Sequence, residues 1–199
     1  MGWLVIVRHG NTFDRGETVL RVGGRTDLPL SQSGQVQAQA LRAHFAGQSF
    51  DHCLCGPLAR QRQTAEAILE HLSRPDHLEH LSGLTEIDYG PDEGQPEEAV
   101  IARIGADALT EWDTNRVPHP DWHIDPDGLR SVWGDLLARA MTSDLIVVTS
   151  NGTARYLFDH VDRGNAPLKL RTGAFGVIAV RPEGARLISW DERPGAPHS

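Results

Sequence analysis

Two runs of consecutive apolar residues stand out along the chain, and a polar turn follows each of them. Residues 4–7 (Leu-Val-Ile-Val) precede Arg8-His9-Gly10, and residues 145–148 (Leu-Ile-Val-Val) precede Thr149-Ser150-Asn151-Gly152. Such runs are typical of strands buried on both faces of a parallel sheet, and ligands bind at the carboxyl ends of strands in sheets of this kind. A guanidinium, an imidazole and a glycine at that position indicate an anion site. A strand that merely ends in polar residues fits this short pattern equally well.

Apolar residues at helical spacing alternate with further segments that resemble strands. A helix capped by Ser31 or Ser33 is predicted to include Val36 and to run to Phe45, before Gly47. Alternating strands and helices predict an α/β fold, a three-layer α/β/α sandwich around a mainly parallel, doubly wound sheet. Further helices are predicted over about 58–72, over 127–140 and from the last apolar strand to about 160. Further extended segments are predicted over 50–55, 78–84, 173–180 and 185–190. The last two are expected to form a hairpin at the sheet edge.

The 199 residues fit a single domain, 1–199, with a lid-like insertion at about 91–126. Five prolines interrupt this insertion, and short helices are predicted near 97–104 and 108–113. Long excursions of this kind often form lids or the walls of substrate sites.

The formal net charge of −8 argues against a general nucleic-acid binder and against a protein that binds anionic membranes. It does not exclude a local cationic pocket for a small phosphorylated substrate. Cys53 and Cys55 are expected to point to opposite faces of one strand, where they are poorly placed to pair, and the sequence has no zinc-type cysteine spacing. With neither a signal-peptide pattern nor an apolar run of membrane-spanning length, a reduced cytoplasmic location is expected.

Polar side chains from distant segments come together if the parallel strands end at a common sheet edge. Arg8 and His9 leave the first strand, Asn151 leaves a later one, Arg60 begins a helix, and Glu86 supplies a carboxylic acid. An imidazole can act as nucleophile, two guanidiniums can neutralise phosphoryl oxygens, and a carboxylic acid can protonate a leaving oxygen. This inventory indicates phosphoryl transfer through a histidine. It needs no metal or cofactor, and no carboxylate cluster for magnesium stands out.

Several other arginines have less certain roles. Arg60 and Arg62 lie in the first turns of their helix, where a cation opposes the helix dipole, and this placement often means that an anion belongs there. Arg62 fits an exposed side chain equally well. Arg15, Arg21 and Arg25, in the loop over 11–30, fit solvated charge better than ligand contacts.

Four stretches of the chain, in the right order, resemble the histidine phosphatase superfamily, which includes the cofactor-dependent phosphoglycerate mutases. The resemblance implies a phosphoglycerate mutase-like fold. Arg8-His9-Gly10 resembles the nucleophile motif, and 27–31 (Asp-Leu-Pro-Leu-Ser) with Gly34 and 38–40 (Ala-Gln-Ala) resembles the entry to the first helix. The third stretch is 56–60 (Gly-Pro-Leu-Ala-Arg) with 63–65 (Gln-Thr-Ala). The fourth, 84–90 (Leu-Thr-Glu-Ile-Asp-Tyr-Gly) with Glu93-Gly94, resembles the segment that carries the acid.

The resemblance implies a role for each matching site residue. His9 is the expected nucleophile, Arg8 and Arg60 are the expected phosphate clamps, and Glu86 is the expected proton donor. The predicted substrate- and phosphate-binding set consists of Arg8, Asn11, Arg60, Asn151 and Gly152.

The chain departs from the family pattern where a second histidine normally stands, because Asn151 occupies that position. An amide can donate a hydrogen bond to a phosphoryl oxygen but carries no charge. Loss of one such donor commonly costs on the order of 10²–10³ in rate, so anion binding is expected to survive better than turnover. His119 or His123 from the insertion is the best placed substitute, unless both are ordinary surface or packing histidines. Gly56 also replaces a family serine, at smaller cost.

Three functions remain open at this stage. A phosphatase, slow or specialised, that forms a phosphohistidine on His9 is favoured because Glu86 accompanies the nucleophile. The alternative is a phosphate-binding pseudoenzyme that keeps the arginine clamp without turnover. A phosphoglycerate mutase is less favoured, because the chain is short and residues 11–12 read Asn-Thr where that branch has Glu-Thr. The expected partner is a small phosphorylated substrate or inorganic phosphate, and the sequence reveals neither the substrate's identity nor the oligomeric state.

Overall fold

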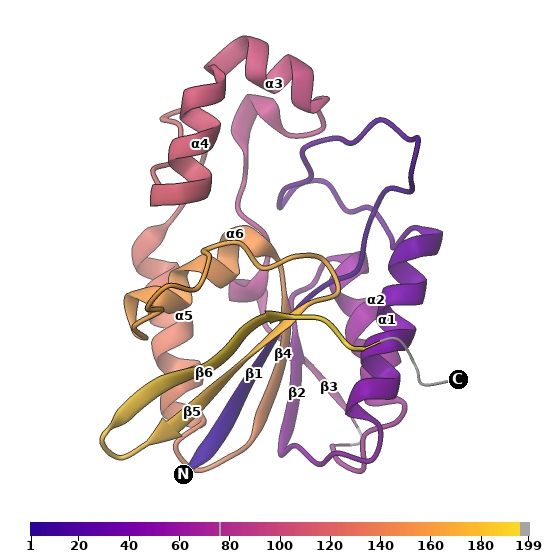
Figure 1. Cartoon of the computed structure of the whole chain (residues 1–199), viewed down its shortest axis with the longest axis vertical. Helices are drawn as coiled ribbons and strands as arrows, with labels where there is room; N and C mark the ends of the chain where they lie inside the picture. Colours follow the sequence, from indigo (N-terminus) through magenta and orange to yellow (C-terminus); the bar gives the residue numbers. More distant parts are fainter. Residues whose placement is uncertain (76, 196–199) are drawn as a thin grey trace.

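The computed structural model describes residues 1–75 and 77–195, and its centre is a six-stranded sheet in the order β3-β2-β4-β1-β5-β6 (Figure 1). Neighbours among the first four of these strands run parallel, whereas β5 is antiparallel to β1 and β6 is antiparallel to β5. The predicted α/β fold with a mainly parallel sheet is therefore confirmed. The strands are β1 (Gly2–Arg8), β2 (His52–Cys55), β3 (Leu78–His80), β4 (Leu145–Thr149), β5 (Phe175–Arg181) and β6 (Gly184–Glu192).

The register of the central strands brings their polar ends to one edge of the sheet. Arg8, the last residue of β1, lies opposite Thr149, the last residue of β4. Cys55, the last residue of β2, lies opposite Val148. The residues that follow these strands therefore start from the same edge, which is the geometry that a ligand site between strands requires.

Helices cover both faces of the sheet, as Figure 1 shows. α1 (Gln32–Phe45) and α2 (Ala59–Leu69) lie on one face, and α5 (Pro126–Arg139), α6 (Asn151–Ala154) and the 3₁₀ turn η3 (Arg155–Asp159) lie on the other. Successive residues of the central strands enter the two apolar cores in alternation, which explains why their sequences are apolar without a break. Leu4, Ile6 and Val147 belong to the core beneath α5, and Val5, Val7 and Val148 belong to the core beneath α1 and α2.

Several predicted boundaries differ from the structure. β2 begins at His52 and α2 ends at Leu69, so both elements are shorter than predicted. The extended segment predicted over 78–84 divides into β3 and a 3₁₀ turn, η1 (Ser82–Leu84). The helix predicted to run to about residue 160 is only the single turn of α6, which continues as η3.

The predicted orientation of the two cysteines was wrong, and one apolar residue of α1 faces solvent. Val36 is 66% exposed, and α1 instead buries Gly34, Ala38, Leu41 and Phe45. Cys53 and Cys55 lie in the same core, because residues two apart on a strand share a face. Both thiols are free, and burial raises the pKa of each to about 12.

The predicted insertion at 91–126 rises above the carboxyl edge of the sheet and contains two helices (Figure 1). These are α3 (Glu97–Ile104) and α4 (Ala106–Asn115), the second somewhat longer than predicted. Trp122 packs edge-to-face on Tyr89 and on Trp112, with centroid distances of 5.0 and 5.5 Å. The indole N–H of Trp122 also donates to Asp92, the last residue of the 3₁₀ turn η2 (Gly90–Asp92), at 2.7 Å. The contact with Tyr89 ties the insertion to the segment before it, and the contacts with Trp112 and Asp92 hold the insertion itself together. No helix in the described part of the chain is long and apolar enough to cross a membrane.

Candidate active site

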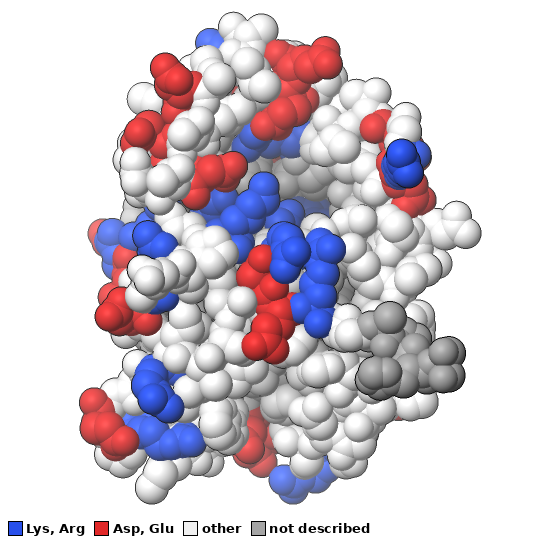
Figure 2. All heavy atoms as spheres, viewed as in Figure 1, with Lys and Arg blue, Asp and Glu red and all other residues white. Residues whose placement is uncertain are grey.

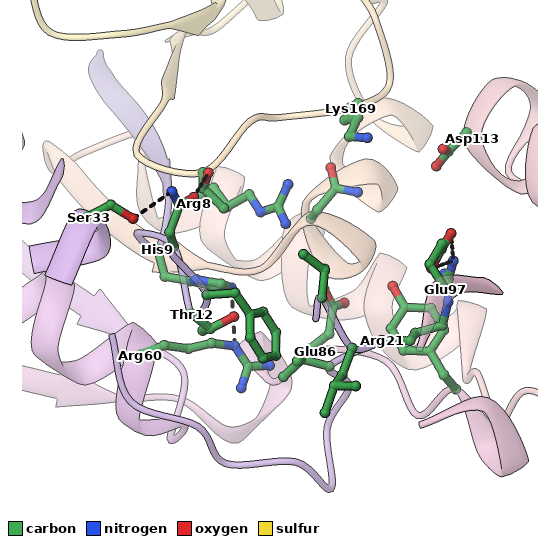
Figure 3. A pocket seen from close by; sticks show the side chains of 18 of the residues that line it. Arg8, His9, Thr12, Arg21, Ser33, Arg60, Glu86, Glu97, Asp113 and Lys169 are labelled. Atoms are coloured by element: carbon green, nitrogen blue, oxygen red, sulfur yellow. Dashed lines mark hydrogen bonds and ion pairs between the residues drawn. The ribbon is translucent and has the colours of Figure 1, made fainter. Parts of the chain in front are cut away.

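A cavity of about 670 Å³ opens where β1 and β4 end, and it is bordered on the far side by α3 and α4. This volume lies within the usual range of small-molecule sites. Figure 2 shows basic side chains gathered in the hollow, and Figure 3 shows its lining from close by. The lining contains six cationic side chains, namely Arg8, Arg15, Arg21, Arg60, Arg155 and Lys169.

His9 leaves β1 at the base of this cavity and is 5% exposed. Its Nδ1 lies 2.7 Å from the carbonyl oxygen of Gly10. Because a carbonyl can only accept, Nδ1 carries the proton and Nε2 has a free lone pair. Burial lowers the pKa of His9 well below its usual value near 6.5, and the charges of Arg60 and Arg8 lower it further. The imidazole is therefore held neutral, in the tautomer that leaves Nε2 unprotonated.

The turn after His9 is packed too tightly for any side chain at its glycine. A Cβ at Gly10 would lie 2.4 Å from the carbonyl oxygen of Gly34, at the start of α1. The N–H of Gly10 donates to the hydroxyl of Thr64 on α2 at 3.2 Å. Both helices on this face of the sheet thus fix the backbone that carries the imidazole.

Arg60, in the first turn of α2, is 1% exposed and contacts His9 directly. Its Nε donates to His9 Nε2 at 3.2 Å, and its two terminal nitrogens donate to the carbonyls of Thr26 and Gly23 at 2.8 and 3.1 Å. Burial lowers the pKa of Arg60, and the nearby carboxylate of Glu86 opposes that effect. Such a cation is bound by neutral acceptors only, so it stays available to a bound anion.

Arg8 and Asn151 are held by the same residue of a distant loop, Leu170. The carbonyl of Leu170 accepts from Arg8 Nη1 at 2.8 Å, and its N–H donates to Asn151 Oδ1 at 2.9 Å. This arrangement leaves the amide nitrogen of Asn151 without a hydrogen-bond partner among the described residues, while Asn151 lines the cavity. The Nε of Arg8 is likewise buried and unpartnered within that part of the chain. Burial lowers the pKa of Arg8.

Glu86 lines the cavity and is 8% exposed. One carboxylate oxygen accepts from the N–H of Ile87 at 2.9 Å and the other from the N–H of Gly152 at 3.1 Å. A Cβ at Gly152 would lie 2.2 Å from Glu86 Oε1, so only glycine allows this approach. Gly152 itself does not line the cavity, and its N–H is occupied by Glu86. Its position is that of a support for the acid.

Asn11 also lines the cavity, but its side chain is bound within the protein. Its Nδ2 donates to the hydroxyl of Ser33 at 3.1 Å, and its Oδ1 accepts from the hydroxyl of Thr172. Its N–H donates to Gln37 at 2.8 Å. The structure therefore brings together Arg8, His9, Asn11, Arg60, Glu86 and Asn151 at one cavity, with Gly152 directly behind Glu86.

The arginines with uncertain roles divide into two groups. Arg15 and Arg21 line the cavity, which the sequence interpretation had not favoured. Arg25 does not, and its guanidinium binds Asp88 at 3.0 Å. Arg62 also lies outside the lining, and it donates to the carbonyl of Pro57 at 2.6 Å.

Neither predicted substitute for the missing histidine enters the cavity. His123 lies against Asp88, with 3.3 Å between Nδ1 and Oδ2, and 74% of its side chain is exposed. His119 packs beside Trp122, with a centroid distance of 6.4 Å. Within the described residues, no group of three or more His, Cys, Asp or Glu side chains could hold a metal ion.

Sequence reasoning missed Arg155 and Lys169, which also line the cavity. Arg155 is fully buried, and it donates to the carbonyl of Trp112 at 2.6 Å and to Asp113 at 2.7 Å. The spacing of four residues from Asn151, about one helical turn, was a signal that could have indicated Arg155. Lys169 lies in an irregular loop, where no periodicity indicates which way a side chain points.

The fold and the site define an α/β protein with a cationic, histidine-containing cavity at the carboxyl edge of its sheet, and one protein family shares this pattern of sequence. Residues 4–192 match the model of the histidine phosphatase superfamily (branch 1). The chain belongs to this superfamily.

Individual relatives include both phosphatases and mutases. The chain is 36% identical over 91 residues to the uncharacterized phosphatase PhoE of Bacillus subtilis, a match that covers 46% of this chain and 45% of PhoE. The chain thus spans less than half the length of that relative. It is 30% identical over 160 residues to the 2,3-bisphosphoglycerate-dependent phosphoglycerate mutase of a Methylobacterium strain, with 76% of each chain covered.

Solved structures show the same fold. The mycobacterial glucosyl-3-phosphoglycerate phosphatase in complex with VO3 superposes with a TM-score of 0.75 at 18% sequence identity, covering 96% of this chain and 99% of the other. At this identity the likeness concerns the fold alone.

Proposed function

We propose that this chain is a phosphatase that hydrolyses small phosphate monoesters through a phosphohistidine on His9. The observation that carries the proposal is the neutral imidazole, whose Nδ1 is fixed by Gly10 and whose Nε2 is held 3.2 Å from a buried guanidinium. Phosphatases among the superfamily relatives support the same activity.

In the first step, a phosphate monoester enters with its dianionic end toward Arg8 and Arg60. Its oxygens accept hydrogen bonds from these guanidiniums and from the free amide nitrogen of Asn151, which oppose the charge that develops in the transition state. Nε2 of His9 gives up its hydrogen bond to Arg60 and attacks phosphorus. The bond from phosphorus to the leaving oxygen breaks, and Glu86 gives that oxygen a proton.

In the second step, water attacks the phosphorus of phosphohistidine. The carboxylate of Glu86 takes the proton of the attacking water, the bond from phosphorus to Nε2 breaks, and inorganic phosphate leaves a neutral His9. Each step returns Glu86 to the state that the other needs, so the cycle requires no further acid or base.

A phosphate-binding pseudoenzyme is the second candidate, and Asn151 is the observation that favours it. An amide supplies a hydrogen bond without a positive charge, so this site stabilises a transferring phosphoryl group less well than one with a second imidazolium. The buried arginines nevertheless keep the site suited to a bound anion.

The test is phosphate release from an aryl phosphate by wild type, His9→Ala and a control, Arg186→Ala, in which an exposed cation outside the cavity is removed. We expect wild type and the control to turn over equally, and His9→Ala to lose on the order of 10³-fold or more. Acid-labile phosphate bound to wild type after a rapid quench, and absent from His9→Ala, identifies the phosphohistidine. Turnover that survives in His9→Ala contradicts the proposal.

The pseudoenzyme makes the opposite prediction in the same samples. It requires that no member of a broad panel of phosphate monoesters is hydrolysed, while inorganic phosphate or vanadate binds to wild type. That binding should weaken in Arg8→Ala and in Arg60→Ala.

A further inference from the structure

Some of the charged side chains that line the cavity have partners within the protein, and others have none among the described residues. Every acid in the lining accepts hydrogen bonds within the protein, and none of them contacts Lys169 or Arg15, two of the cations that line the same cavity. These acids are Glu97, bound by Arg21 at 2.7 and 2.8 Å; Asp113, bound by Arg155 at 2.7 Å; Asp14, bound by the N–H groups of Gln32 and Ser33; and Glu86, bound by two backbone N–H groups.

Lys169 is the only lysine in the sequence, and it lies in this lining. Its ammonium group has no hydrogen bond or ion pair with any residue of the described chain, and the same holds for Arg15. Figure 3 shows the ammonium beyond the guanidinium of Arg8, on the side of the cavity that Asp113 borders. It therefore lies away from His9 and toward the region where the rest of a substrate has to lie.

The backbone around Lys169 is fixed by the phosphate-binding residues themselves. The next residue, Leu170, bonds to both Arg8 and Asn151, and its side chain is fully buried. Two residues further on, the hydroxyl of Thr172 donates to Asn11. Because neighbouring Cα atoms are only about 3.8 Å apart, Lys169 cannot move far from this anchored segment.

A phosphate group bound between Arg8 and Arg60 leaves Lys169 and Arg15 without a direct partner in the lining. Its two negative charges are matched by Arg8 and Arg60, both of which contact only neutral acceptors. Lys169 and Arg15 are exposed in the same cavity lining, and no acid of the described residues contacts either of them.

We propose that Lys169 forms a second anion-binding position, and that the preferred substrate is a small phosphate monoester with a second acidic group, either a carboxylate or another phosphate. The inference deepens the proposed function, since it names the substrate class of the same site. It concerns binding, however, and so can be tested apart from turnover.

The experiment measures the binding of three matched ligands to the His9→Ala protein, which retains bound esters. The ligands are 3-hydroxypropyl phosphate, which has a neutral end, 3-phosphooxypropanoate, which has a carboxylate, and propane-1,3-diol bisphosphate, which has a second phosphate. We expect one or both of the diacids to bind on the order of fivefold more tightly than the neutral ester, the gain typical of one exposed ion pair. The two diacids distinguish carboxylate from phosphate, and salt should reduce the preference.

In the same background, Lys169→Ala should abolish this preference and Lys169→Arg should restore it. The matched control is Arg186→Ala, which removes an exposed cation outside the cavity and should keep the preference. Equal binding of the three ligands, or a preference that survives Lys169→Ala, overturns the inference.

Chemical modification gives an independent readout because the chain has one lysine. Acetylation removes the charge of Lys169, whereas reductive methylation keeps it. Both reagents also modify the N-terminal amine, and acetylation removes its charge as well, but this amine bonds to the carbonyl of Met141 outside the cavity lining. The acetylated protein should lose the preference for diacids and the methylated protein should keep it.

The outcomes separate this inference from the proposed function. Phosphate release by wild type that depends on His9, without any preference for diacids, retains the phosphatase and removes the second anion position. A preference that depends on Lys169, without hydrolysis by wild type, retains the position and removes the phosphatase.

Discussion

The Nε of Arg60 donates a 3.2 Å hydrogen bond to Nε2 of His9. A cation thus lies on the lone pair that the proposed reaction uses, which keeps the imidazole unprotonated and prevents its free rotation. An arriving phosphate offers the guanidinium a charged acceptor in place of a neutral nitrogen, and charge-assisted hydrogen bonds are the stronger kind. Substrate binding is therefore expected to release Nε2 as the phosphorus comes within reach.

Arg60→Ala is expected to lower kcat/KM for an aryl phosphate on the order of 10²–10³-fold, because it removes a buried guanidinium from the transferring phosphoryl group. Arg60→Lys should recover only part of the loss, since an ammonium cannot reproduce the forked contacts to His9, Thr26 and Gly23. Arg62→Ala, on the same helix but outside the cavity, is the control. Equal kinetics for the Arg60 and Arg62 variants would remove the clamp from the mechanism.

Gly152→Ala is expected to displace Glu86, because the new Cβ would lie 2.2 Å from Oε1. The proposed proton donor, Glu86, then loses its alignment while the arginines stay in place. We expect kcat to fall on the order of 10²-fold, with little change in the inhibition constant of inorganic phosphate. Gly195→Ala meets no atom within 4 Å and serves as the control. A loss of phosphate binding that parallels the loss of kcat would instead place Gly152 in the anion site.

Asn151→His is expected to raise kcat on the order of 10²-fold, because an imidazolium adds charge to the donor that already faces the cavity. Asn151→Ala should lower kcat, because it disturbs two hydrogen-bonding groups of the site. It removes the free amide nitrogen, and it also releases the N–H of Leu170, whose carbonyl holds Arg8. Rapid-quench kinetics on the three proteins measures both effects. An unchanged kcat in Asn151→His would show that the missing charge does not limit turnover.

The pKa of His9 also predicts how stability responds to pH. In the folded chain this pKa lies well below 6.5, whereas in the unfolded chain it returns to about 6.5. As pH falls below about 6.5, the unfolded chain therefore gains a proton that folded His9 does not take up. The free energy of unfolding drops by up to about 1.4 kcal/mol per pH unit until the folded pKa is reached.

His9→Gln removes this contribution while keeping a neutral side chain. Urea unfolding gives the free energy of unfolding of both proteins at several pH values between about 7.5 and about 5. The difference between the two slopes of that free energy against pH is the contribution of His9. We expect wild type to lose stability faster on acidification. Parallel slopes would show that His9 is not held neutral by the fold.

The strand ends and the site residues beside them could be predicted from the sequence for a simple reason. Arg8, His9 and Asn151 directly follow apolar runs, and parallel strands bring their carboxyl ends to one edge. Glu86 and Arg60 lie outside such runs, and the resemblance of their motifs indicated them. The error over Cys53 and Cys55 was one of strand periodicity, and the exposed Val36 shows that helical spacing alone does not say which stripe of a helix faces the core.

The residues that the sequence did not indicate reach the cavity through non-local packing. β5 returns antiparallel beside β1, and the N–H of Gly173 lies 3.2 and 3.1 Å from the carbonyls of Arg8 and His9. This pairing brings Lys169, Leu170 and Thr172 to the site, although their loop has no periodic pattern. The contact of Arg155 with the carbonyl of Trp112 depends in the same way on where α4 lies above the sheet.

The sequence by itself therefore determined the α/β fold and the site residues at the strand ends, because apolar periodicity and strand ends are local properties of the chain. Only the tertiary structure decided which tautomer His9 adopts, which residues hold Arg8 and Glu86, and which cations stay unpaired. Those features depend on distances between segments far apart in the sequence, such as Arg8 and Leu170, which are 162 positions apart. No periodicity along the chain encodes such distances, because packing alone sets them.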